Sequence, residues 1–282
     1  MSLDTVGVIG AGVTGCGVAQ DLACHDFSVF LVDISYDILA RAKKDIKNGI
    51  RFQRLFSEES PDSGEALDRI TFSTSYGILA DIFLVIECID EIWDMKRDLL
   101  SLLDGLCRKE CIFASSTSAI PISRLAAATK RPAQVIGIHF MNPVPHKALV
   151  ELIPGVETSG GTIEKACNLL ERLGKSYVLV KDSPGFVSNR VLMGSINEAA
   201  ALLEEGVATA AEIDRIFRGC FEHKMGPLET ADLIGLDTVL RTLEVLDGCL
   251  PGRHFRPAGI LREHVESGRL GRKSGRGFYD YC

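Results

Sequence analysis

A glycine-rich turn between a short β-branched run and a helical pattern constrains this chain more than any other feature. Residues 6–9 are Val-Gly-Val-Ile, and the pattern Gly-x-Gly-x-x-Gly follows at Gly10, Gly12 and Gly15. Gly10 permits a tight turn, Gly12 lets a pyrophosphate approach the backbone, and Gly15 lets helix and strand pack closely. The start of the helix offers N–H groups and a partial positive charge to phosphates. The pattern therefore predicts a dinucleotide-binding strand, turn and helix.

A second apolar run ends in the acid that such a site needs. Residues 27–32 lead into Asp33, which lies about 20 residues beyond the glycines, where the fingerprint places a carboxylate for the ribose hydroxyls. Its charge would repel a 2′-phosphate, and Ile34 offers no arginine in compensation. We therefore expect NAD rather than NADP as cofactor. The alternative is a Rossmann fold whose site is empty or has another use.

Composition narrows the class of protein. With 282 residues, 46% of them hydrophobic, the chain can bury a large core and form two domains. No apolar run approaches the roughly 20 residues of a membrane span, and a strand near the N-terminus leaves no room for a signal peptide. Nine scattered cysteines without a Cys-x-x-Cys pair predict a reduced, cytoplasmic protein, and they form no metal-ligand spacing with the histidines. A net charge of −7 argues against nucleic acid as a partner.

The order of elements predicts an α/β fold followed by a helical domain. Apolar runs typical of buried parallel strands lie between helical patterns, at residues 70–73, 82–87, 111–114, 135–138, 149–153 and 177–180. After a break at residues 182–185, only helical periods remain, at residues 186–205, 210–220, 228–246 and 261–265. We expect a Rossmann-type, doubly wound, mostly parallel sheet in residues 1–183 and an all-α domain in residues 184–282.

Two polar residues in apolar surroundings are candidates for catalysis. His139 comes at the carboxyl end of a predicted strand, and Glu151 interrupts the apolar run of the next one. A buried carboxylate is costly without a partner, and a carboxylate beside a histidine fixes the tautomer of a general base. The alternative is a purely structural histidine beside a turn. Hydroxyl groups also gather at residues 115–118, after another strand, where ligands of open α/β sheets bind.

Helical rather than strand spacing is expected over residues 35–69, and the helix ends around the acidic turn at residues 57–64. Basic residues recur on one face of this helix. They are Arg41, Lys44, Lys47, Arg51 and Arg54. A solvated helix face and a site for an anionic group are both open.

Six segments resemble the 3-hydroxyacyl-CoA dehydrogenases and follow the order of that family. They are Gly10–Gly15, Ser115–Ser118, His139–Pro145, Ser183–Arg190, Met225–Pro227 and Gly271–Tyr281. The resemblance extends from residue 5 to residue 281, so that it covers nearly the whole chain.

The resemblance implies a role for each candidate residue. His139 corresponds to the family's catalytic histidine and Glu151 to its partner, while Ser118 and Asn189 would orient the hydroxyl or carbonyl group of the substrate. The implied reaction is oxidation of a 3-hydroxyl group next to a thioester, with hydride transfer to NAD. It also implies a homodimer formed through the helical domain.

The residues that the motif and the resemblance place at the cofactor surround the glycine turn and the ends of neighbouring strands. They are Gly10, Gly12, Val13, Thr14, Gly15, Asp33, Glu91, Lys96, Ser116 and Asn142. Asp33 would bind the adenine ribose, and Glu91 with Lys96 would lie near the nicotinamide ribose.

Four positions depart from the family pattern. Thr14 replaces a usual Met, Ser116 a usual Asn, Lys147 lies one residue early, and residues 56–60 replace a Lys-rich turn with an acidic one. These changes resemble a biosynthetic branch whose members oxidise glyceryl or hydroxymalonyl groups on an acyl carrier protein, for polyketide extender units. The alternative is a 3-hydroxybutyryl-CoA dehydrogenase of fatty-acid or butanoate metabolism.

Two readings from other classes are also open. One is a protein that binds NAD without turnover. The other is a β-hydroxyacid dehydrogenase, which uses a catalytic lysine in its helical domain, and no lysine here replaces Asn189.

Overall fold

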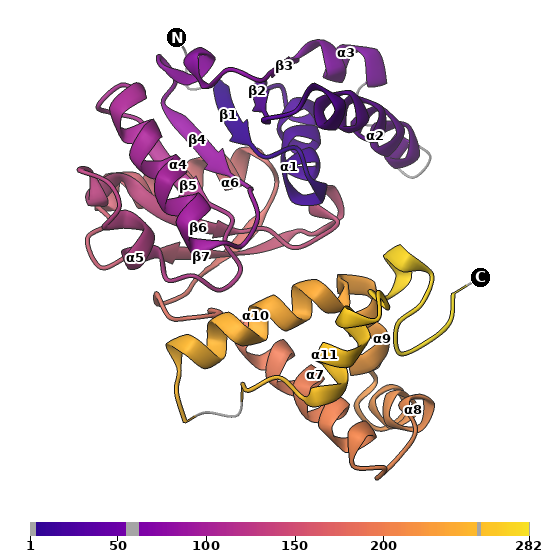
Figure 1. Ribbon diagram of the computed structural model, residues 1–282. Coiled ribbons are helices and arrows are strands. Elements are labelled where there is room, and N and C mark those ends of the chain that lie inside the picture. The colour runs from indigo at the N-terminus through magenta and orange to yellow at the C-terminus, as the bar shows by residue number, and fades with distance from the viewer. Residues whose placement is uncertain (1–3, 55–61, 253–254, 282) are drawn as a thin grey trace. The chain divides into compact units, whose positions relative to one another are not determined.

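The computed structural model describes residues 4–54, 62–252 and 255–281 (Figure 1). The chain divides into two compact units, Met1–Ser183 and Pro184–Cys282. The acidic residues Glu58 and Glu59 of the predicted turn lie outside the described residues.

The first unit is built on an eight-stranded sheet with the order β3-β2-β1-β4-β5-β6-β7-β8. The strands are β1 (Thr5–Ile9), β2 (Ser28–Val32), β3 (Ile70–Ser73), β4 (Leu84–Glu87), β5 (Ile112–Ser115), β6 (Val135–His139), β7 (Leu149–Pro154) and β8 (Ser176–Leu179). Strands β1 to β6 are parallel, β7 runs antiparallel to β6, and β8 is parallel to β7. The expected Rossmann-type, mostly parallel sheet is thereby confirmed.

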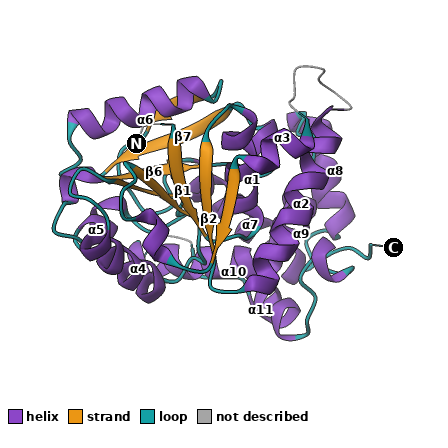
Figure 2. Ribbon diagram, turned by 90° about the horizontal axis from the view of Figure 1, so that it is seen from above, coloured by secondary structure: helices purple, strands orange, loops and turns teal. Residues whose placement is uncertain are grey.

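Helices cover both faces of this sheet, which explains why its strands are continuous apolar runs. The helices are α1 (Val13–Cys24), α2 (Tyr36–Arg54), α3 (Ser63–Asp68), α4 (Trp93–Leu106), α5 (Ile122–Ala126) and α6 (Gly160–Arg172). One core cluster joins α1, α2, α3 and α6 to alternate strand residues such as Val8 and Ile86. Figure 2 shows α6 on one side of the sheet and α4 and α5 on the other.

The strand order reverses between β1 and β4, and this reversal positions the site. The connections from β1 lead outward through β2 to β3, whereas those from β4 lead the other way to β5 and β6. In open α/β sheets, ligands bind in the crevice that such a reversal leaves at the carboxyl ends of the strands. The glycine turn after β1 lies at this edge.

The helix expected over residues 35–69 is present as α2 and α3 on either side of residues 55–61, which the structure does not describe. Asp62 starts α3, because its Oδ1 accepts a hydrogen bond of 2.8 Å from the N–H of Gly64. An aspartate in this position satisfies an N–H group that the helix itself leaves unbonded. The basic face of α2 is exposed to solvent.

The second unit is helical. It contains α7 (Ser188–Glu204), α8 (Ala210–Phe221), α9 (Pro227–Ile234), α10 (Leu236–Cys249) and α11 (Gly259–Glu266). The single helix expected over residues 228–246 is wrong, because Gly235 has a φ of 102° and separates α9 from α10. That backbone conformation is open to glycine at little cost and ends a helix.

Two buried aspartates tie the last described segment to these helices. Asp232 accepts hydrogen bonds of 3.0 Å from the N–H groups of Phe278 and Tyr279 and from the hydroxyl of Tyr281. Asp214 accepts one of 2.7 Å from the Tyr279 hydroxyl. Both carboxylates are fully buried, so that the C-terminal segment is part of the core of this unit.

Among the described residues, no helix combines the length and the apolar character that crossing a membrane would take.

Replacing Asp232 with Ala should lower the free energy of unfolding by roughly 2–4 kcal/mol, because it leaves buried donors without acceptors. Urea denaturation followed by circular dichroism measures this loss. The control is Asp280→Ala, since Asp280 is 74% exposed and paired with an exposed Arg276. Such a surface pair contributes little to stability. Equal effects of the two substitutions would contradict the structural role of Asp232.

Candidate active site

The glycine turn has the shape that a bound pyrophosphate requires. Gly10 has a φ of 95°, and a Cβ there would lie 2.6 Å from the carbonyl oxygen of Cys88. A Cβ on Gly15 would overlap the carbonyl oxygen of Gly10. A Cβ on Gly12, in contrast, would have no heavy atom within 4 Å. The first and third glycines therefore allow the turn and the packing, and the second leaves open space for a ligand.

The ends of α1 and β2 supply the charges for such a ligand. No side chain caps the N-terminus of α1, whose N-cap is Gly12. Asp33 follows β2, and its Oδ2 accepts a hydrogen bond of 2.8 Å from the N–H of Ala11. This bond fixes the carboxylate beside the glycine turn. Val13 and Ile34 expose 79% of their surface at this edge.

These residues fit NAD. The uncapped helix end suits the pyrophosphate, the space above Gly12 admits it, and the Asp33 carboxylate can accept hydrogen bonds from the ribose hydroxyls. When bound, NAD supplies the hydride acceptor.

A buried lysine holds two carboxylates beside this turn. Lys96 exposes 1% of its side chain, and its Nζ lies 2.6 Å from Oε1 of Glu87 and 3.4 Å from Oε2 of Glu91. It also donates a hydrogen bond of 3.1 Å to the carbonyl oxygen of Ile89. Since the ammonium group has three hydrogens, these acceptors occupy it. Lys96 thus binds protein groups here, and its contact with a ribose stays a prediction.

Glu91 in turn holds the hydroxyl-rich segment that follows β5. Its Oε1 accepts hydrogen bonds of 2.5 Å from the Thr117 hydroxyl and of 2.8–3.2 Å from the N–H groups of residues 118–120. Burial opposes the charged form, but Lys96 and these hydrogen bonds outweigh it and hold the pKa of Glu91 below its usual range. The ionised carboxylate therefore fixes the backbone that carries Ser118.

Glu87 completes this network and was not recognised in the sequence. It accepts a hydrogen bond of 2.6 Å from the Ser115 hydroxyl, and its backbone carbonyl accepts one of 2.8 Å from the N–H of Ser116. The signal was the same as for Glu151, namely a carboxylate within an otherwise apolar strand. Ser116 lies directly at the carboxyl end of β5.

His139 and Glu151 meet because β7 runs antiparallel to β6. The two residues are direct partners in the register of these strands, so that their side chains share one face. His139 Nδ1 lies 2.8 Å from Oε2 of Glu151, and the two residues expose only 4% and 8% of their surface. With the Nδ1 proton donated to the carboxylate, Nε2 is the ring atom suited to accept a proton from a substrate.

The segment after His139 returns to the glycine turn. Asn142 Nδ2 donates a hydrogen bond of 3.0 Å to Oγ1 of Thr14, in the first turn of α1. The structure therefore brings together two of the residues predicted at the cofactor, from positions 128 apart in the chain.

Asn189 lies in the first turn of α7, in the second unit. Its role next to the substrate stays a prediction.

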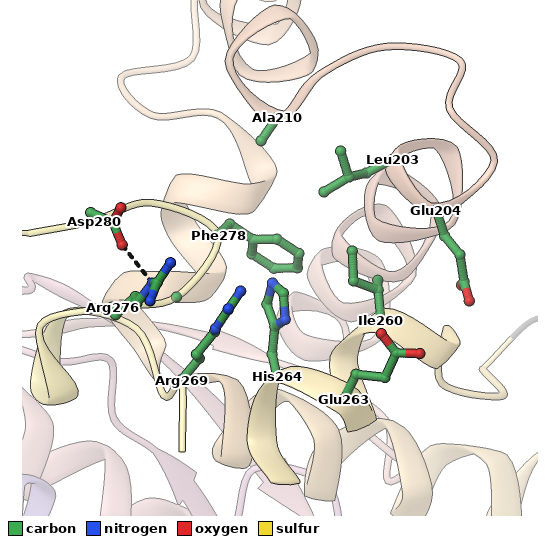
Figure 3. Close-up of a pocket in the computed structure, with 11 residues that line it drawn as sticks. Leu203, Glu204, Ala210, Ile260, Glu263, His264, Arg269, Arg276, Phe278 and Asp280 are labelled. Atoms are coloured by element: carbon green, nitrogen blue, oxygen red, sulfur yellow. Dashed lines mark ion pairs between the residues drawn. The ribbon is translucent and has the colours of Figure 1, made fainter. Parts of the chain in front are cut away.

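The second unit contains a cavity of about 510 Å³. Figure 3 shows the side chains of His264 and Arg269 next to each other and close to Phe278, with the Arg276–Asp280 ion pair beside them. None of the residues predicted to contact the cofactor or the substrate lines this cavity. In the ranges that the structure describes, no three His, Cys, Asp or Glu residues form a group that could hold a metal ion.

Comparison with known proteins agrees with these features. Residues 5–183 match the model of the 3-hydroxyacyl-CoA dehydrogenase NAD binding domain, and residues 185–281 match that of the C-terminal domain of the same family. The chain is 46% identical to the "Probable 3-hydroxybutyryl-CoA dehydrogenase" of Deinococcus radiodurans, over 98% of this chain and 99% of that one. It is 44% identical to the 3-hydroxybutyryl-CoA dehydrogenase of Bradyrhizobium diazoefficiens, over 98% and 94% of the two chains.

A solved structure extends the likeness to three dimensions. The (S)-3-hydroxybutyryl-CoA dehydrogenase of Ralstonia eutropha superposes with a TM-score of 0.90 at 43% identity, and all of both chains is covered. Both family models together cover nearly the whole chain, and its glycine turn and Asp33 fit the cofactor of that family. The chain therefore belongs to the 3-hydroxyacyl-CoA dehydrogenase family and is an NAD-dependent oxidoreductase that acts on a CH–OH group.

Proposed function

We propose that this protein oxidises the 3-hydroxyl group of a short 3-hydroxyacyl thioester, with coenzyme A as the thiol. The observation that carries the proposal is the buried pair of His139 and Glu151 at the same sheet edge as the dinucleotide turn. The names of the relatives from Deinococcus, Bradyrhizobium and Ralstonia support a four-carbon acyl group on coenzyme A.

The residues of this chain divide the reaction between them. His139 Nε2 accepts the proton of the 3-hydroxyl group while C3 releases its hydrogen as a hydride and the C–O bond becomes a carbonyl. Glu151 stabilises the imidazolium that forms, because its carboxylate already lies 2.8 Å from Nδ1. In the opposite direction the imidazolium returns the proton to the oxygen.

Ser118 orients an oxygen atom of the substrate in this proposal. Glu91 contributes by fixing the backbone of residues 118–120 through three N–H groups. A hydroxyl group on a fixed backbone loses little conformational freedom when it binds a substrate, and such positioning is a large part of what a protein contributes to hydride transfer.

A carrier-protein thioester is the second candidate, and the exposed basic face of α2 favours it. Carrier proteins are acidic, so that Arg41, Lys44, Lys47 and Arg51 would attract one. The acidic turn at residues 57–64 gives less support, although its carboxylates would repel a phosphate of coenzyme A. Asp62 is the one acidic residue of this turn that the structure describes, and it pairs with Arg54 at 2.7 Å. A paired carboxylate repels a phosphate less than a lone one.

The helical unit is proposed to form a homodimer. Aliphatic and aromatic side chains are exposed on it, among them Val207, Ile216, Phe221 and Leu233. Where such side chains form a contiguous patch, they mark a contact between proteins. Light scattering should give twice the mass of one chain, and a monomer at micromolar concentration would contradict the proposal.

Substituting His139 with Gln should lower kcat by about 10²–10⁴-fold and leave the Kd of NADH nearly unchanged, because only proton transfer is lost. Glu151→Gln should lower kcat less, since the imidazolium loses a charged partner but the base remains. NADH fluorescence titration and steady-state kinetics measure both quantities. The control is His146→Gln, which changes an exposed histidine nearby. If His139→Gln keeps most of the kcat, the mechanism is wrong.

Asp33→Ala should weaken NAD binding roughly tenfold to a hundredfold, because hydrogen bonds to a charged group are lost, and should narrow the preference for NAD over NADP. Kinetics with both cofactors test this. Asp37→Ala removes the same charge from an exposed position in the first turn of α2 and should leave the preference as it is. An unchanged preference in Asp33→Ala would exclude the proposed ribose contact.

The thiol carrier is decided by kcat/KM on one acyl group attached to coenzyme A, to a carrier protein and to pantetheine. We expect the coenzyme A ester to be preferred. In the double variant Lys47→Glu/Arg51→Glu, a drop confined to the carrier-bound substrate and abolished by high salt would favour the carrier protein instead, because exposed charges are screened over about 8 Å at physiological ionic strength.

A further inference from the structure

A buried lysine outside the predicted site joins the cofactor helix to the segment that follows His139. Lys175 precedes β8, and its Nζ lies 2.9 Å from Oδ2 of Asp21, in α1. It also donates hydrogen bonds of 2.9 Å to the carbonyl oxygens of Val144 and Lys147. We call these four groups the Lys175 clamp.

The ion pair of the clamp is buried. The side chains of Lys175 and Asp21 each expose 3% of their surface. The ammonium group donates hydrogen bonds to the two carbonyl oxygens and forms an ion pair with the carboxylate. Removing the lysine would leave a buried carboxylate and two carbonyl groups without this donor, which is costly in a medium of low dielectric constant.

The clamp lies between α1 and the turn that follows His139, and the inference depends on this position. Val144 and Lys147 lie at the two ends of the turn that follows His139, and the same segment contains Asn142, which is bonded to Thr14. A Cβ on Gly17 would lie 3.0 Å from Cβ of Val144, so that α1 and this segment are in close contact. The segment is thus attached to α1 at its first turn, through Thr14, and two turns later, through Asp21.

We propose that Lys175 is a positioning residue that fixes residues 140–147 against α1, so that the placement of His139 and the binding of NAD depend on the same buried ion pair. The inference rests on the proposed role of His139 as general base. The role of Lys175 in NAD binding does not rest on that proposal, because the glycine turn and α1 hold the cofactor whatever the substrate is.

A purely structural role makes a different prediction, and the chain offers a matched control. Arg131 is another cation held by protein acceptors, with 12% of its side chain exposed, Nε 2.6 Å from Oδ1 of Asp104 and Nη1 2.6 Å from the carbonyl oxygen of Arg108. These groups precede β5 and β6, and the parallel strands place them at the sheet edge opposite to the glycine turn. Arg131→Met therefore removes a comparable cation from the same unit, away from the cofactor.

The experiment compares Lys175→Met with Arg131→Met in the full-length protein, at a temperature where circular dichroism shows both to be folded. NADH fluorescence titration gives the Kd, and kinetics with 3-hydroxybutyryl-CoA give kcat. Lys175→Met should raise the Kd about threefold to thirtyfold. It should lower kcat by about tenfold or more, because a displacement of about 1 Å can cost roughly a hundredfold. Arg131→Met should keep both values within about twofold of the wild type.

Asp21→Asn provides the test if Lys175→Met does not fold. It removes the ion pair but keeps both carbonyl bonds of the lysine, so that smaller changes in the same two quantities are expected. Unchanged Kd and kcat in the folded variant would overturn the proposal, as would equal losses in Lys175→Met and Arg131→Met. A lower kcat with an unchanged Kd would contradict the shared dependence. If the wild type oxidises no 3-hydroxyacyl thioester, the proposed function fails, and the NADH titration still decides the role of the clamp.

Discussion

The parallel direction of β1 to β6 is the constraint on which the site of the first unit depends. Parallel strands bring all their carboxyl ends to one edge of the sheet, so that the glycine turn, Asp33, Glu87 and His139 lie along that edge although they come from separate parts of the chain. Strand β7, which runs antiparallel to β6, brings Glu151 back to the same edge from the opposite direction. The directions of the strands therefore bring these residues together at one edge of the sheet.

Four carboxylates near this edge are paired with a lysine or a histidine. Lys96 holds Glu87 and Glu91, Lys175 holds Asp21, and Glu151 is bonded to His139. An unpaired charge in such surroundings would cost roughly several kcal/mol, whereas a charge that is paired and hydrogen-bonded is tolerated. The pairs also restrict the backbone around them. A site built in this way has little freedom to rearrange when ligands bind.

The fold class was predicted from two patterns in the sequence, a glycine motif and a series of apolar runs, and both of these signals are local. The Gly-x-Gly-x-x-Gly turn and the continuous apolar strands follow from short stretches of sequence, and the sheet confirms them. The single helix over residues 228–246 was wrong, because the effect of one glycine depends on the backbone angle that its surroundings impose. Lys175 was missed for a related reason, because its partners lie far along the chain or on other elements and no spacing rule connects them. Glu87 gave the same signal as Glu151, a carboxylate in an apolar run.

The burial of Asp214 and Asp232 has a consequence for the synthesis of the chain. Both carboxylates lie in the helical core. Asp232 accepts its hydrogen bonds from residues 278–281, and Asp214 accepts one from Tyr279 besides those from the first residues of α9. During translation the helices of this unit therefore emerge before the groups that complete their core, and the unit must wait for its last segment. The eight-stranded sheet, in contrast, is complete once residue 179 has emerged. The two halves of this enzyme are thus expected to mature in order, with the cofactor-binding half first.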